Sequence, residues 1–149
     1  MPLDRAWLLA HIPHQGSMCL LERVEAWDDQ HIRCTAGSHR LSDNPLRDQG
    51  RLGVACGIEY AAQAMAAHGA LLLAADQAPR AGYLTSVRSV MLAVDRLDDI
   101  ASDLLVEAQR LSGDDNNILY GFSVSAGGRE LLSGRATVVL DTDKLGKST

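Results

Sequence analysis

One glutamate and one glutamine stand in an otherwise apolar stretch of the chain, and they are the first candidates for chemistry. Glu59 and Gln63 are four residues apart, so on a helix both side chains leave the same face about one turn apart. A carboxylate enclosed by apolar neighbours loses hydration, which raises its pKa and lets it hold a proton near neutrality. We therefore predict that Glu59 is a general acid or base and that Gln63 is its neighbouring amide. The alternative is a chemically silent Glu59 that is ion-paired with Arg47 or Arg88.

A histidine and a helix start could complete such a site. His14 lies in the segment Ile12-Pro13-His14-Gln15-Gly16, where it either fixes the loop by a hydrogen bond or takes part in catalysis. Gly53 and the amides of Val54 and Ala55 precede the apolar stretch, and amides at a helix start favour developing negative charge on a ligand carbonyl.

The remaining histidines and the cysteines give no metal site. His11 and His14 have H-x-x-H spacing, but Pro13 between them breaks a helical presentation. No further His or Cys stands at zinc-ligand spacing, so we predict no metal. The other histidines are expected at the surface or satisfied in the core: His31, His39 and His68.

The elements that must position these residues follow from hydrophobic periodicity and turn residues. The pattern predicts a short helix over Arg5–His11 and one long helix over Val54–Ala75. Six strands are expected, at 18–27, 31–39, 83–92, 104–111, 118–125 and 131–140, with a polar tail at 141–149. Runs of strands with one segregated helix indicate an α+β architecture.

The long helix carries small residues on nearly every side, mostly alanine. A helix that is apolar all round is normally enclosed, so we expect a curved antiparallel sheet to wrap it closely. Its 22 residues span about 33 Å, which is longer than a strand pair is wide, so one end is expected to meet another subunit.

Composition excludes several classes of protein. The chain has 149 residues, a formal net charge of -5 and 46% hydrophobic residues, which is typical of a single globular domain. An acidic chain does not suit a nucleic-acid partner, and the apolar stretch is too short and too polar to span a membrane. Three cysteines without a CxxC pair and no visible secretory signal favour a cytoplasmic location.

Two segments resemble a known family. The segment from Ile12 to Val24, IPHQGSMCLLERV, resembles the LPHRxPxLLLDRV opening of hotdog-fold 3-hydroxyacyl-acyl carrier protein (ACP) dehydratases. The segment from Gly53 to Ala64, GVACGIEYAAQA, resembles their central-helix motif and is most similar to the dehydratase-like hotdog proteins of aryl-polyene gene clusters. The resemblance implies a single hotdog domain over residues 1–149, with about six strands around one central helix.

The resemblance also implies a reaction, in fatty-acid or aryl-polyene type biosynthesis. In such dehydratases a His takes a proton from C2 of a 3-hydroxyacyl thioester, and a Glu from the other subunit's helix protonates the departing hydroxyl. Carried over by position, Glu59 is the acid and Gln63 its neighbouring amide. Amides near Gly53, Val54 and Ala55 contact the substrate carbonyl. No cofactor is implied, because the substrate is carried on the phosphopantetheine of ACP or on CoA.

The chain departs from the family at one place. The usual catalytic His lies in a loop before the helix, but the corresponding segment, 42–50, contains none. Asn44, in this loop, is a candidate substrate contact. The candidates for a substitute base are His14, Asp43 and Asp48.

Three functions therefore stay open. The first is a 3-hydroxyacyl-thioester dehydratase, the second a hotdog acyl thioesterase, and the third a non-catalytic partner in a dehydratase heterodimer. Exposed sheet edges favour a homodimer or heterodimer in each case. An acidic carrier protein would need a local basic surface, for which the candidates are Arg47, Arg51, Arg80 and Arg88.

Overall fold

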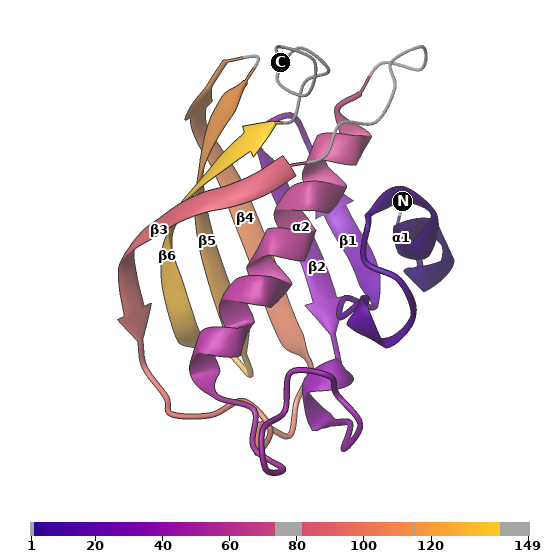
Figure 1. Ribbon diagram of the computed structural model, residues 1–149, viewed down its shortest axis with the longest axis vertical. Coiled ribbons are helices and arrows are strands. Elements are labelled where there is room, and N and C mark those ends of the chain that lie inside the picture. The colour runs from indigo at the N-terminus through magenta and orange to yellow at the C-terminus, as the bar shows by residue number, and fades with distance from the viewer. Residues whose placement is uncertain (1, 74–81, 115, 141–149) are drawn as a thin grey trace, which may run out of the picture.

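The computed structural model describes residues 2–73, 82–114 and 116–140 (Figure 1). One helix lies across one face of a six-stranded antiparallel sheet, and a short N-terminal helix packs beside it (Figure 1). The helices are α1 (Arg5–His11) and α2 (Gly57–Leu71), with 3-10 turns η1 (Gly16–Met18), η2 (Ser38–Arg40) and η3 (Val54–Cys56). The strands are β1 (Arg23–Trp27), β2 (His31–Ala36), β3 (Gly82–Leu92), β4 (Leu104–Gly113), β5 (Asn117–Ala126) and β6 (Arg129–Leu140). This is the α+β hotdog architecture that the sequence predicts.

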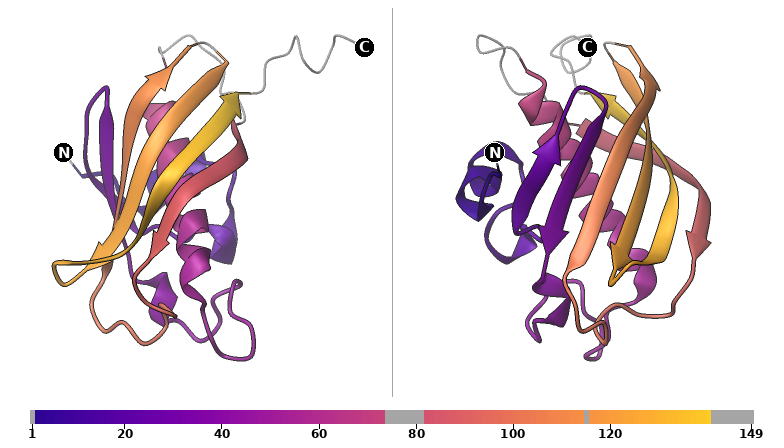
Figure 2. Two further views of the ribbon diagram at one scale, coloured as in Figure 1. Left: turned by 90° about the vertical axis from the view of Figure 1, so that its left-hand side faces the viewer. Right: turned by 180° about the vertical axis from the view of Figure 1, so that it is seen from behind.

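The sheet has the strand order β1-β2-β4-β5-β6-β3, so β1 and β3 are its two edges. Two hairpins, β4–β5 and β5–β6, form its centre through the turns that the Gly- and Asn-containing segments predict. Alternate residues of β5 are buried against the helix side, as period-2 patterning requires. Figure 2 shows from two further sides how the sheet curves around α2.

The contact between α2 and the sheet depends on small residues. A Cβ atom added to Gly57 would lie 2.6 Å from Leu132 Cδ2, so the Leu132 side chain would have to shift to admit it. The buried face of α2 also includes Tyr60, Ala61 and Ala64. The sequence-based reason for an alanine-rich helix, close approach to the sheet, is thereby confirmed.

The opposite side of α2 is not enclosed by this chain. Residues Glu59, Ala62, Ala66 and Gly69 retain partial exposure, although their neighbours on the sheet side are fully buried. The expectation of a helix enclosed on all sides is wrong for a single chain, because the sheet covers only one face.

Several predicted boundaries differ from the observed ones, by one or two residues in β3 to β6 and by more in three places. Residues 18–22 do not join β1. The amides of Met18 and Cys19 donate to the carbonyls of Gln15 and Gly16, and the Leu20 amide donates to Gln63 Oε1, so within the described residues only Glu22 bonds the neighbouring strand β2, at the Thr35 carbonyl. Strand β2 ends at Ala36, before the 3-10 turn η2. The predicted helix from Val54 starts as a 3-10 turn, and its α-helical part ends at Leu71. Its predicted last residues, 74 and 75, and the polar tail at 141–149 lie outside the described residues.

Candidate active site

His14 and Glu59 meet in the folded chain. His14 lies in the loop between α1 and η1, and Glu59 lies in the first turn of α2. His14 Nε2 is 3.3 Å from Glu59 Oε1, and the side chains are 24% and 37% exposed, respectively. Two of the predicted candidates therefore form one contact that is partly open to solvent.

The His14 contact sets the charge state of Glu59. The hydrogen bond from His14 lowers the pKa of the Glu59 carboxyl and outweighs burial, which acts to raise it. The predicted rise in the pKa is therefore wrong for this chain, because an imidazole supplies what lost hydration removes. Above its lowered pKa, Glu59 is a carboxylate that can accept a proton.

The predicted alternative for Glu59 was an arginine ion pair, and its partner is a histidine instead. Arg47 donates from Nη1 to the Gly50 carbonyl and from Nη2 to the His39 carbonyl. Its guanidinium therefore binds the backbone near its own loop and not Glu59. Arg88 lies on the edge strand β3.

The second ring nitrogen of His14 bears on which tautomer suits the site. Nδ1 is buried and has no hydrogen-bond partner within the described residues. A buried N–H donor without a partner is costly, so a neutral imidazole would carry its hydrogen on Nε2. The Nε2 atom faces Glu59 Oε1 at 3.3 Å.

Gln63 is fully buried and holds the loop that follows His14. Its Nε2 donates to the Met18 carbonyl at 2.7 Å, and its Oε1 accepts from the Leu20 amide at 2.8 Å. Gln63 also contributes to lowering the pKa of Glu59. Gln63 therefore lies beside the candidate site, as predicted, but its polar atoms already bind this chain.

One of the predicted helix-start amides is bonded within the described residues. The amide of Val54 donates to the Asp95 carbonyl at 3.0 Å. Gly53 forms an isolated β-bridge with Arg96, but the amides of Gly53 and Ala55 donate no backbone hydrogen bond to the described parts of the chain. A carbonyl contact at this position is therefore open to Gly53 and to the exposed Ala55.

Asn44 has a structural position in the loop that lacks the usual histidine. Its Nδ2 donates to the Ser38 carbonyl and to Tyr60 Oη, and its Oδ1 accepts from the Leu46 amide. These bonds use both Nδ2 hydrogens and one of the two acceptor sites of Oδ1, so the substrate contact by Asn44, which lines a hollow, stays a prediction. The side chain ties the loop to α2 through Tyr60.

The two aspartates proposed as substitute bases lie in different places. Asp43 lines a hollow of about 260 Å³ with Asn44, Arg5 and Ser38. Asp48 is exposed in a turn, where its backbone is bonded to that of Arg51. Of the three candidate bases, His14 is the one that contacts Glu59.

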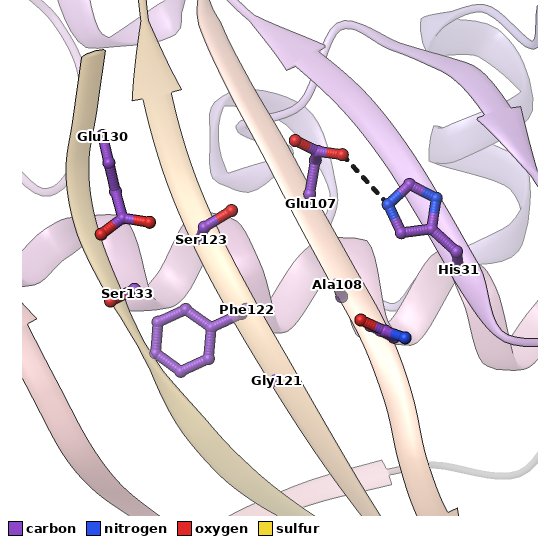
Figure 3. Close-up of a pocket in the computed structure, with 9 residues that line it drawn as sticks. His31, Glu107, Ala108, Gly121, Phe122, Ser123, Glu130 and Ser133 are labelled. Atoms are coloured by element: carbon purple, nitrogen blue, oxygen red, sulfur yellow. Dashed lines mark hydrogen bonds and ion pairs between the residues drawn. The ribbon is translucent and has the colours of Figure 1, made fainter.

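A second hollow lies on the sheet face away from α2, where Figure 3 shows the side chains that line it. It measures about 260 Å³ and sits over Gly121, with His31 and Glu107 on one side. His31 Nε2 is 3.0 Å from Glu107 Oε2. Linear spacing predicts no partner for His31, because β2 and β4 are distant in sequence.

The other two histidines are buried, as expected for core residues, although His39 Nδ1 has no hydrogen-bond partner within the described residues. His39 Nε2 bonds the Ile100 carbonyl at 3.0 Å. His68 bonds Tyr120 Oη through Nδ1 and the Asp28 carbonyl through Nε2, both at 2.8 Å. Burial lowers the pKa of both imidazoles, so they serve as neutral structural links.

The described residues contain no group of three or more His, Cys, Asp or Glu side chains arranged to hold a metal ion. Among the helices of the described ranges, none has the length and apolarity needed to cross a membrane.

Comparison with known proteins adds the family. The family model for ApeP-like proteins, described as ApeP dehydratase, matches residues 8–147. No curated protein matches the chain. Among solved structures, the dehydratase heterocomplex ApeI:P from Xenorhabdus doucetiae is 24% identical, with 92% of each chain covered and a TM-score of 0.80.

Thioesterases share the fold at lower identity. A mutant thioesterase from Pseudomonas aeruginosa is 15% identical, covers 92% of this chain and 93% of its own, and has a TM-score of 0.66. A putative thioesterase from Silicibacter sp. TM1040 is 17% identical, with 94% and 93% covered and a TM-score of 0.60. The family match extends over nearly the whole chain, both predicted motifs included, and the chain therefore belongs to the ApeP-like dehydratase family.

Proposed function

We propose that this chain is a subunit of a dehydratase that removes water from a 3-hydroxyacyl thioester to give a 2-enoyl thioester, in fatty-acid or aryl-polyene type biosynthesis. The observation that carries the proposal is the 3.3 Å contact between His14 Nε2 and Glu59 Oε1. It supports a positioned carboxylate at the start of the central helix, partly open to a substrate. The ApeP-like family match supports the reaction class.

The charge states favour Glu59 as the group that moves the proton. The Glu59 carboxylate takes a proton from C2, the C2–C3 double bond forms, and the bond from C3 to the hydroxyl oxygen breaks. The protonated Glu59 then delivers the same proton to the departing hydroxyl, so that water leaves and the carboxylate is regenerated. No net proton is gained or lost by the protein.

His14 acts in this mechanism as a positioning residue. Its Nε2 faces the Glu59 carboxylate at 3.3 Å, and a neutral imidazole that gave up its Nε2 proton would become an unfavourable anion. The Nε2–H group instead orients the Glu59 carboxylate and keeps it ionised. The resemblance implies that Glu59 is the acid and a histidine the base. In the proposed mechanism Glu59 has both roles.

A backbone amide of the chain is expected to bind the substrate carbonyl. The open amide of Ala55 would donate to the thioester carbonyl, whose oxygen gains negative charge when C2 loses its proton. No cofactor is required, because the phosphopantetheine arm of ACP or CoA belongs to the substrate.

A second hotdog chain is expected to complete the assembly. The solved neighbour is described as a heterocomplex, ApeI:P, which supports a heterodimer over a homodimer for this chain. Strand β3 is an unpaired edge of the sheet. It exposes four large apolar side chains, which are Tyr83, Leu84, Met91 and Leu92.

The test is an assay of enoyl-thioester formation. The chain, alone and with a co-purified hotdog partner, is incubated with a 3-hydroxyacyl thioester of CoA or ACP, and the conjugated product is followed by its absorbance. We expect Glu59→Gln to lose activity by a factor of about 10² or more, while Glu22→Gln, an exposed control, retains it. Equal rates for the wild type and Glu59→Gln in both settings would refute the proposal.

Hydrolysis is the second candidate function. An ionised Glu59 that is 37% exposed also suits activation of a water molecule against the thioester carbonyl. The same incubations therefore include a thiol reagent: release of free thiol identifies a thioesterase, because dehydration leaves the thioester intact.

An acidic carrier protein is expected to dock at the loop before η3, which contains Arg51. Of the predicted basic residues, Arg51 is exposed, Arg47 closes its own loop, and Arg80 lies outside the described residues. Arg51→Glu should weaken binding of an acidic carrier protein, whereas Arg23→Glu on the distant edge strand β1 should not.

All three cysteines are free thiols, which supports a reducing, cytoplasmic location.

A further inference from the structure

Two arginines stand side by side at one edge of the sheet. Arg88 of β3 and Arg135 of β6 are directly paired in the antiparallel register, and both are exposed. They lie on the face away from α2, because the neighbours of Arg135 on β6, Gly134 and Ala136, face inward: Ala136 is buried and Gly134 lies against Phe122. Like charges directly opposite on neighbouring strands destabilise a sheet.

Within the described residues, neither of these arginines has a carboxylate partner. The arginines that do form ion pairs in that part of the chain are others: Arg33 with Glu107, Arg40 with Asp103, and Arg96 with Asp98. In a chain of net charge -5, a basic pair beside an open strand edge, without a carboxylate partner among the described residues, is complementary to a partner of opposite charge.

The position of Arg88 within β3 matters for self-association. Strand β3 runs from Gly82 to Leu92, so its middle residue is Val87, and Arg88 is its only charged residue. If two copies paired antiparallel along the whole strand, the two-fold axis would pass near Val87. Each Arg88 would then face Ser86 of the other copy, and the two Arg88 side chains would be diagonal neighbours about 7–8 Å apart.

The irregularities of β3 leave this central stretch in place. Its register with β6 shifts between Leu84 and Ser86 and again between Arg88 and Met91, and Ser89 has a positive φ of 55°. Ser86 to Arg88 keep consecutive partners between these shifts. Bulges and charges are common means of blocking unwanted edge pairing.

From this geometry we propose that Arg88 and Arg135 select the partner subunit: they oppose β3–β3 pairing of two identical chains and favour a different hotdog chain whose edge strand carries Asp or Glu at the facing positions. This inference rests on the pairing suggested under the proposed function. A second copy would bring four guanidinium groups together on one face of a continuous sheet. A carboxylate-bearing strand would neutralise them while covering the apolar residues of the same edge.

The test uses a charge-swapped copy of this chain as the probe partner. The variant Arg88→Glu/Arg135→Glu is mixed with the wild type at low ionic strength, and native mass spectrometry counts the two homodimers and the mixed dimer. We expect the mixed dimer well above its statistical share, and a dissociation constant roughly tenfold lower than that of the wild-type homodimer. Added salt should weaken the mixed dimer and strengthen the wild-type homodimer, because it screens attraction and repulsion alike.

The matched control is Arg23→Glu/Arg129→Glu, which makes the same change in net charge at other exposed strand residues. This control should mix with the wild type without preference. Three outcomes would overturn the proposal. The mixed dimer could be equally enriched with the control variant, the wild-type homodimer could be insensitive to salt and to both substitutions, or no mixture could contain a dimer. Because the readout is mass and not turnover, this result is independent of whether Glu59 catalyses dehydration.

Discussion

His14 Nε2 and Glu59 Oε1 lie 3.3 Å apart, and this contact gives the central helix a carboxylate with a lowered rather than a raised pKa. The imidazole belongs to the loop after α1 and the carboxylate to the first turn of α2. Both candidate groups are therefore supplied by one chain, whereas the resemblance implied a histidine and a glutamate from two subunits.

Replacing His14 separates positioning from proton donation. His14→Gln keeps an N–H group that can donate to Glu59, so we expect activity within about tenfold of the wild type. His14→Phe removes the donor and should cost a factor of about 10² or more. Enoyl-thioester formation measures both; an equally large loss in the two variants would instead assign the transferred proton to His14.

The pH dependence of the rate should report the charge of Glu59. Since the carboxylate is the active form, the rate should fall as the pH falls through its lowered pKa. His14→Phe removes the largest cause of that lowering, so the acid limb of the kcat/KM profile should move to higher pH. Glu22→Gln is the control, and an unmoved limb in His14→Phe would contradict the electrostatic role of the histidine.

Gln63 should matter for stability as well as for the site. Gln63→Leu leaves the Met18 carbonyl and the Leu20 amide without their partner, and each such buried group costs about 1–3 kcal/mol. We expect the free energy of unfolding in urea to fall by about 2–4 kcal/mol. Gln109→Leu, on an exposed residue of β4, should change it little, and equal effects would show that the two bonds contribute nothing.

The buried histidine His68 should make stability depend on pH. Its pKa in the folded chain is lowered from 6.5 by burial, so between the lowered value and 6.5 the unfolded chain binds more protons. Stability should therefore rise with pH across that window and be lost as the pH falls through the folded pKa. Urea unfolding from pH 5 to 7.5 should show a smaller slope for His68→Gln, and the exposed control His11→Gln should keep the wild-type slope; parallel slopes for His68→Gln would count against this account.

The sequence by itself determined the architecture and the main candidate residues. Period-2 patterning and turn residues fixed six strands, and the alanine-rich segment fixed one central helix, because these local signals depend on spacing and side-chain size alone. The same spacing placed Glu59 and Gln63 on one helical face, and the resemblance of two motifs pointed to the family that the comparison then showed.

Only the tertiary structure decided which of these residues meet. The contact of His14 with Glu59, the use of Asn44 and of the Val54 amide within the chain, and the pairing of Arg88 with Arg135 all join segments that are distant in sequence. The pKa of Glu59 depends on the balance between lost hydration and a hydrogen bond, and that balance is set by which side chain the fold brings within reach. The apolar surroundings of Glu59 could be anticipated from composition. Its partner His14 could not, because His14 lies in a loop that is distant from Glu59 in sequence.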